Sequence, residues 1–149
     1  MKRAVPYATM MTVFAVLSLC MTSMAYSAAP AIVKTYSVTL TPSPKSQSVA
    51  PGGTATVTIT ESSTGSSAFT VTACVLEIAT SSAGPFTKSS CSVPTSYSIP
   101  AHGSVKVGLT IAFATTATAG KYYFRFYNTG TVGSSSDKTK MASFTVTIT

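Results

Sequence analysis

The chain has 149 residues and a formal net charge of +7, yet charged side chains make up only 9% of it. Apart from Lys2 and Arg3, its Lys and Arg residues are scattered without a basic run, which argues against a nucleic-acid-binding surface. Three acidic residues and one histidine leave few ways to build a carboxylate pair or a Ser-His-Asp triad. We therefore expect a protein that is not an enzyme and that holds no cofactor or metal ion.

Residues 1–29 have the organisation of a secretory signal peptide. Lys2 and Arg3 form a positive start, an uncharged apolar segment spans residues 8–25, and small residues follow it. We expect cleavage between residues 25 and 29. The apolar segment is also nearly long enough to cross a bilayer, so retention as a membrane anchor is the alternative. The predicted location is secreted, periplasmic or at the cell surface.

The rest of the chain alternates apolar residues with small hydroxyl residues, and this period of two predicts strands with one face in a core. Thr54–Thr60 and Ser143–Thr149 show the alternation most clearly. Turn residues separate the strands, and no segment after the leader has a helical period. About seven short strands predict an all-β fold, a single antiparallel β-sandwich over residues 34–149. In chain order, strands are expected at 36–41, 54–60, 69–75, 86–93, 105–113, 122–126 and 142–148.

Three interruptions of the alternation lead to local predictions. Pro42–Pro44 is expected to break the first strand, because proline cannot donate a hydrogen bond to a ladder. The alternation of Phe69, Val71, Ala73 and Val75 puts Cys74 on the outer face of its strand. Its phase changes at Val75–Ile78, which predicts a bulge or a strand end there. The Gly- and Ser-rich segment Thr129–Asp137 is expected to be the tip of a hairpin.

Two cysteines, Cys74 and Cys91, remain once Cys20 leaves with the leader. In an exported chain such a pair is more often a disulfide than two free thiols or a metal site. A metal site would need two more ligands, and His102 is the only histidine. A disulfide across this short loop would stabilise the fold by about 3 kcal/mol in the chain-entropy model.

The segment Val49–Val57, followed by Thr118–Phe124 and the alternating Thr-Val tail, resembles the immunoglobulin-like (Ig-like) domains of bacterial and archaeal exported and cell-surface proteins. The resemblance covers roughly residues 34–149 and implies a β-sandwich. It also implies that Tyr122 forms a tyrosine corner, in which the hydroxyl bonds back to upstream backbone. The chain departs from antibody-type domains, since Phe124 stands in place of the second core cysteine and tryptophan is absent from the sequence.

One candidate binding surface follows from the strand at 122–126. The alternation that puts Phe124 and Phe126 in the core turns their neighbours to the opposite face. These neighbours, Tyr123, Arg125 and Tyr127, would stand in a row. Tyr and Arg dominate binding hot spots, and Tyr stacks on sugars. The competing interpretation is a cation–π patch packed beneath a neighbouring loop.

Together these features predict an exported, non-enzymatic Ig-like domain with a structural or adhesive role at the cell surface or in the extracellular space. The expected partner is a protein or polysaccharide at the cell surface, or a second copy that adds through strand edges. No nucleic acid is expected, and a membrane only if the leader is retained. The alternative is a soluble polysaccharide- or protein-binding module that uses the exposed Tyr/Arg face.

Overall fold

The computed structural model describes residues 36–94 and 96–149, and the predicted leader lies outside this range. The described residues form ten strands and no helix, so the all-β prediction is confirmed. Among them, no helical segment is long and apolar enough to cross a membrane. The strands are β1 (Val38–Ser43), β2 (Ser46–Val49), β3 (Thr54–Ser63), β4 (Phe69–Ala79), β5 (Thr87–Ser89), β6 (Tyr97–Ile99), β7 (Ser104–Ala112), β8 (Gly120–Val132), β9 (Ser135–Lys138) and β10 (Ala142–Ile148).

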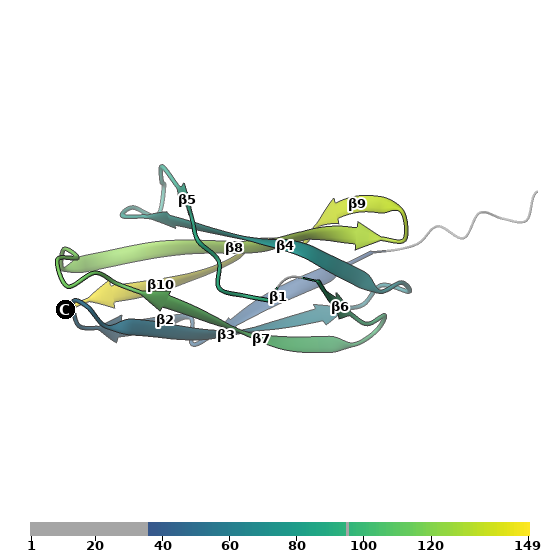
Figure 1. Cartoon of the computed structure of the whole chain (residues 1–149), viewed down its shortest axis with the longest axis horizontal. Helices are drawn as coiled ribbons and strands as arrows, with labels where there is room; N and C mark the ends of the chain where they lie inside the picture. Colours follow the sequence, from purple (N-terminus) through teal and green to yellow (C-terminus); the bar gives the residue numbers. More distant parts are fainter. Residues whose placement is uncertain (1–35, 95) are drawn as a thin grey trace, which may run out of the picture. The chain divides into compact units, whose positions relative to one another are not determined.

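The strands are arranged in two layers (Figure 1). One sheet has three strands in the order β1-β3-β7. The other has seven, along the path β2-β10-β8-β4-β5, with β6 paired to β4 and β9 paired to β8. The chain changes sheets at Pro44, so β2 runs beside β10 in the same direction. This parallel pair and the ten strands differ from the predicted antiparallel sandwich of about seven strands.

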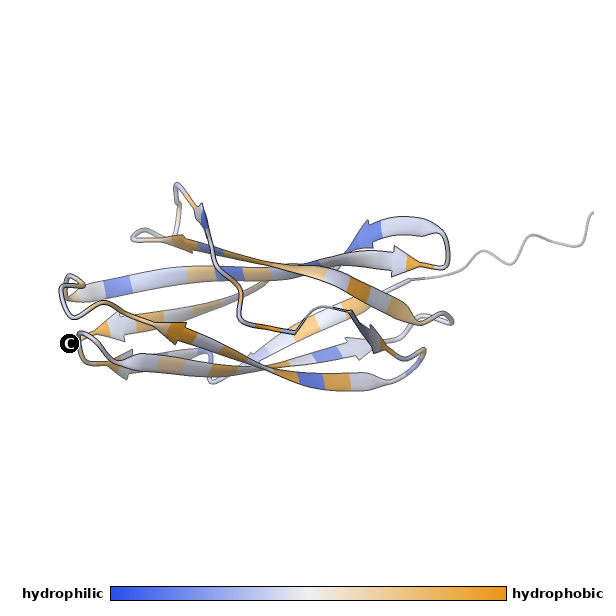
Figure 2. Cartoon of the chain, viewed as in Figure 1, coloured by the Kyte–Doolittle hydropathy of each residue, from blue (hydrophilic) through white to orange (hydrophobic). Residues whose placement is uncertain are grey.

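The core lies between the two sheets and draws on both of them. Buried side chains alternate along β3 and β8, and Figure 2 shows this alternation as orange bands along the strands. Val57 and Ile59 face the core from β3, and Phe124 faces it from β8. The Phe124 ring stacks on Phe144 of β10, with centroids 5.1 Å apart. Each such buried side chain stabilises the fold by about 1.5–3 kcal/mol, so this core decides which face of each strand points outward.

The bulge in β4 lies upstream of its predicted position. The register with β8 shifts between Val71 and Ala73, and pairing then continues to Ala79. An extra residue inverts the phase of a strand, so Leu76 is buried after the bulge, as Val71 is before it. Cys74 consequently packs against the core, and its predicted place on the outer face was wrong. The small residues between the two phases fit either face, which is why the sequence pattern placed the change too late.

The segment Thr129–Asp137, expected as a hairpin tip, is largely paired. Strand β8 continues to Val132 and β9 begins at Ser135, so the turn itself consists of Gly133 and Ser134. Gly133 has a φ of 63°, in the left-handed region that two-residue hairpin turns require. The predicted tip was too long, because backbone hydrogen bonds hold this ladder and a Gly- and Ser-rich composition gives no sign of them.

Candidate functional site

Strand β8 carries the predicted surface row on the outer face of the seven-stranded sheet. Tyr123, Arg125 and Tyr127 are half-buried, whereas the intervening Phe124 and Phe126 are buried in the core. Side chains alternate between the faces of a strand, so the three residues of the row share the face turned away from the core. Strands β10 and β4 flank β8 on its two sides, which places the row in the middle of the sheet.

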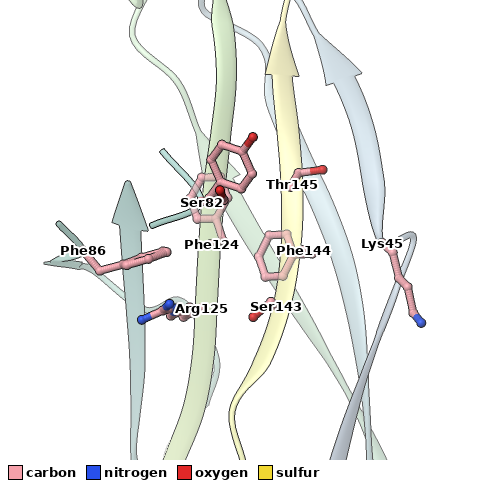
Figure 3. Close-up of a pocket in the computed structure, with 9 residues that line it drawn as sticks. Lys45, Ser82, Phe86, Phe124, Arg125, Ser143, Phe144 and Thr145 are labelled. Atoms are coloured by element: carbon pink, nitrogen blue, oxygen red, sulfur yellow. The ribbon is translucent and has the colours of Figure 1, made fainter. Parts of the chain in front are cut away.

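Arg125 is covered by an aromatic ring from the loop between β4 and β5. The guanidinium carbon lies 3.6 Å from the centroid of the Phe86 ring, and Figure 3 shows the two side chains together. This distance is that of a cation–π contact. It is the arrangement that the competing interpretation described, a cation–π patch packed beneath a loop. Because the ring covers one face of the guanidinium, only part of Arg125 is available to an external partner.

The side chain of Tyr123 is engaged less closely by its neighbours than that of Arg125. The Nζ atom of Lys121 lies 5.6 Å from the centroid of its ring, near the limit of about 6 Å for a cation–π contact. Lys121 is exposed, so its long side chain can move away without breaking any packing. Tyr123 is therefore better placed than Arg125 to stack on a ligand.

A cavity of about 250 Å³ lies beside the Phe86–Arg125 pair (Figure 3). In the view of Figure 3, Phe86 and Arg125 lie at one end and Lys45 at the other. Aromatic rings next to hydroxyl groups and cations suit a polar ligand with an apolar face, such as a sugar. We call this the first cavity; it is lined by Lys45, Ser82, Phe86, Tyr123, Phe124, Arg125, Ser143, Phe144 and Thr145.

Tyr127 lines a different cavity, of about 420 Å³, so the structure does not bring the whole row into one pocket. This second cavity includes Met141, which is 51% exposed, and two carboxylates, Glu77 and Asp137. Its lining is completed by Lys138, Thr139 and Lys140. Among the residues that the structure describes, no three His, Cys, Asp or Glu side chains are grouped so that they could hold a metal ion.

Tyr122 occupies the start of β8, where the strand leaves the core. Its hydroxyl donates to the backbone oxygen of Thr118 at 2.9 Å, and its ring packs against Phe113. This is the backward hydrogen bond that the Ig-like resemblance implied for Tyr122. It fixes the turn before β8 and therefore the place at which the outer row begins.

Cys74 and Cys91 form a disulfide, with their Cα atoms 6.1 Å apart. The bond ties β4 to the connection between β5 and β6, two short strands that both pair with β4. The next residue, Ser92, contacts the edge strand β7. Its Oγ accepts from the Thr110 N–H at 3.0 Å and donates to the Thr110 carbonyl at 3.1 Å. Ser92 thus occupies backbone groups that a neighbouring strand would otherwise use.

A buried polar cluster was missed by the sequence analysis. Glu61 of β3 and Asn128 of β8 are both 0% exposed between the sheets. Oε1 of Glu61 accepts from the Tyr97 hydroxyl and from Nδ2 of Asn128, each at 2.7 Å. A signal was present, because the period of two through Val57 and Ile59 continues to position 61. We call Glu61, Tyr97 and Asn128 the Glu61 cluster.

Neither protein-family models nor curated proteins match this sequence. One similar solved structure is a family 123 glycoside hydrolase from Clostridium perfringens, with 9% identity and a TM-score of 0.54 over 75% of this chain and 27% of that one. The sporulation control protein Spo0M from Bacillus subtilis has 12% identity and a TM-score of 0.48, with 76% and 50% covered. The alkylpurine DNA glycosylase AlkC from Pseudomonas fluorescens has 15% identity and a TM-score of 0.45, with 75% and 30% covered.

At such low identities the likeness concerns the fold alone, and the two TM-scores below 0.5 support no argument. The chain spans half or less of the length of each of these proteins. None of the three is described as an Ig-like domain, and the Ig-like resemblance stays a prediction.

Proposed function

We propose that this chain is an exported, non-catalytic domain with a structural or adhesive role, and that the outer face of its seven-stranded sheet is the contact surface. The observation that carries the proposal is the pair of cavities along β8. Tyr123 lines the first and Tyr127 the second, and the exposed Met141 extends the second. Aromatic residues and Met are enriched where proteins contact partners.

The strand order supports an Ig-like arrangement. In Ig-like topology the strands A, B and E share one sheet, and C, F and G share the other. Here β1, β3 and β7 take the places of A, B and E, while β4, β8 and β10 take those of C, F and G. The Cys74–Cys91 disulfide supports an oxidising compartment, since disulfides persist outside the cytosol.

The environments of the carboxylates support a non-catalytic role. Glu61 is buried inside the core, without access to a substrate. Glu77 and Asp137 line the second cavity together with lysines, and Asp137 is exposed. A glycosidase needs a general acid in a secluded apolar pocket opposite a second carboxylate. The second cavity instead places its carboxylates at an open surface beside Lys138 and Lys140.

The adhesive role is tested by binding to whole cells. Purified protein is labelled, and its binding to cells of the producing organism is measured for the wild type and for Tyr123→Ala/Tyr127→Ala. We expect the double variant to bind about tenfold less tightly or worse, because it removes the aromatic anchors of both cavities. Thr56→Ala, on the outer face of the other sheet, is the matched control and should bind like the wild type. Equal binding by all three proteins contradicts the proposal.

Export is tested by the intact mass of the mature protein. A chain that begins between Tyr26 and Pro30 supports cleavage of the leader and release from the membrane. A full-length chain that is found only in the membrane fraction contradicts release and supports a retained anchor.

A second candidate function is a soluble polysaccharide-binding module. The first cavity favours it, since Tyr123 and the ring of Phe86 line the same space as the hydroxyl group of Thr145. Calorimetric titration with neutral and acidic polysaccharides tests this candidate. For a polysaccharide-binding module, we expect Tyr123→Ala to abolish polysaccharide binding and Tyr127→Ala, in the other cavity, to leave it unchanged. If the outer face binds a protein instead, both variants should lose binding to cells. The adhesive role and the polysaccharide-binding role therefore predict different results for Tyr127→Ala.

A further inference from the structure

A carboxyl group lies between the two sheets at a position that the proposed contact surface does not use. Oε1 of Glu61 accepts from Tyr97 and from Asn128, and Nδ2 of Asn128 also donates to the Tyr97 hydroxyl at 3.0 Å. Glu61 belongs to the three-stranded sheet, and its two partners belong to the other sheet. The Glu61 cluster is therefore a polar connection between the two sheets.

Two acceptor atoms of the Glu61 cluster are buried and have no hydrogen-bond partner within residues 36–94 and 96–149. They are Oε2 of Glu61 and Oδ1 of Asn128, and they belong to the two groups already joined by the Oε1–Nδ2 hydrogen bond. An ionised carboxylate in a core needs donors or positive charge at both oxygens. A phenol and an amide serve only Oε1 and bring no positive charge. The hydrogen-bond pattern is thus incomplete by one donor.

Among the residues that the structure describes, no positive charge is found to act on Glu61 either. The phenol of Tyr36 interacts electrostatically with Glu61 and is itself neutral at physiological pH. Burial, followed by the charges of Asp137 and Glu61, raises the pKa of Tyr36 to about 12. The groups that face Glu61 are Leu40 of β1 and Val105 of β7 in its own sheet, Tyr97 of β6, Asn128 of β8, and Tyr36 before β1.

We propose that Glu61 carries a proton in the folded protein, and that Oε2–H donates a hydrogen bond to Oδ1 of Asn128. With Oε1 already accepting from Nδ2, the second hydrogen bond closes a cyclic acid–amide pair between β3 and β8. One proton then satisfies both unpartnered atoms. The carboxylate takes this proton from solvent as the chain folds, and the acid returns it when the chain unfolds at a pH where free glutamate is ionised.

The consequence is a contact between the sheets that responds to pH. Burial raises the pKa of Glu61 above its ordinary value of 4.5, and the hydrogen bonds from Tyr97 and Asn128 act in the opposite direction. Between pH 4.5 and the folded-state pKa, the folded chain holds a proton that the unfolded chain releases. The contribution of this proton to the free energy of unfolding is therefore fully present below pH 4.5, and it is lost as the pH rises through this window. The Tm should fall by roughly 4 °C for each pH unit inside it.

The proton can be observed directly, because Glu61 and Glu77 are the only glutamates in the sequence. Protein labelled with ¹³C at the glutamate carboxyl carbon gives two signals, which Glu61→Gln and Glu77→Gln assign. We expect the Glu61 signal at pH 6 to have the chemical shift of a protonated acid. A Glu61 signal with the shift of a carboxylate at pH 6 overturns the proposal.

Thermal unfolding from pH 5 to pH 8 gives a second test. In Glu61→Gln, the amide can donate to Oδ1 of Asn128 in place of the proposed hydroxyl, and it cannot ionise. Its Tm should lie within about 2 °C of the wild-type value at pH 5 and above it at pH 8. Glu77→Gln should keep the wild-type slope. A wild-type Tm that does not change with pH overturns the proposal, and if Glu61→Gln does not fold, the wild-type NMR spectrum decides.

Discussion

The two faces of β8 hold polar side chains under opposite conditions. On the outer face, Tyr123 and Arg125 are half-exposed, so water can satisfy their polar groups when no partner is bound. On the inner face, Asn128 is fully buried, and Glu61 and Tyr97 are the partners of its side chain. A polar group that water can reach contributes little to stability, whereas a buried one costs much when its partner is lost. Side-chain parity along one strand therefore separates residues available for contact from residues required for folding.

Glu61→Ala is the most severe test of the difference between the two faces of β8. This variant leaves a part-buried donor, the Tyr97 hydroxyl, and a buried one, Nδ2 of Asn128, without the Glu61 acceptor. We expect a loss of about 3–4 kcal/mol in the free energy of unfolding, measured in urea at pH 6. Glu77→Ala, on the same sheet as the outer row, should lose under about 0.5 kcal/mol. Equal losses would mean that burial does not distinguish the two faces.

Gly130→Ala tests the inner face by adding volume. A Cβ at Gly130 would collide with the backbone carbonyl of Thr70 and lie 2.8 Å from Cζ of Phe69. Backbone atoms cannot move aside cheaply, so we expect a loss of about 2–3 kcal/mol in urea unfolding. Gly108→Ala on β7 is the control, because no heavy atom lies within 4 Å of its Cβ position. It should be neutral or slightly stabilising, and a loss equal to that of Gly130→Ala would contradict the steric argument.

Tyr122→Phe should have an effect on stability between those of the inner-face and the outer-face substitutions. It removes the hydrogen bond to the Thr118 carbonyl and keeps the ring that packs against Phe113. Water can reach this carbonyl, so we expect a loss of about 0.5–1 kcal/mol in urea unfolding. Tyr123→Phe, which removes a hydroxyl from the outer face, should show no measurable loss. A larger loss from Tyr123→Phe would place the outer row among the residues that hold the fold together.

Tyr123→Ala removes a whole side chain from the outer face, and only a small effect on stability is expected. Its half-exposed ring lies over the sheet rather than in the core, so the Tm should fall by no more than about 2 °C. If the first cavity binds a ligand, the same variant should lose that binding. A fall in Tm comparable to that of Gly130→Ala would show that Tyr123 serves the fold, and it would weaken the proposed contact surface.

The outer row was predicted from the alternation along β8, and the structure places its three residues on one face. A loop packed over the row was the competing interpretation, but the covering residue was not identified, because Phe86 reaches Arg125 from the loop between β4 and β5. Nor was the division of the row between two cavities, which depends on β9 and on the segment before β10. Parity is a local property of a strand, whereas the contents of a pocket are set by neighbours distant in sequence.

The alternation of β3 also indicated that position 61 faces inward, yet the strand was predicted to end at Thr60. A carboxyl group in a core is stable only with partners, and Tyr97 and Asn128 lie 36 and 67 residues further along the chain. The short strands β2 and β6 were missed for a similar reason. Hydrogen bonds to β10 and β4 hold them in place, and three or four residues are too few to show a period.

Ser92 has a consequence for how this protein behaves when it is crowded. In an antiparallel edge strand, alternate residues direct both backbone groups outward. Thr110 is such a residue, so Gly108 and Lys106, two and four positions before it, are too. The outer edge of β7 therefore presents a row of backbone groups with which an incoming strand can pair. Ser92 occupies the backbone groups at one end of this row, and Lys106 brings a charge to the rest of it. Since Ser92 follows Cys91, the disulfide anchors the residue that covers this edge, although β7 itself contains no cysteine.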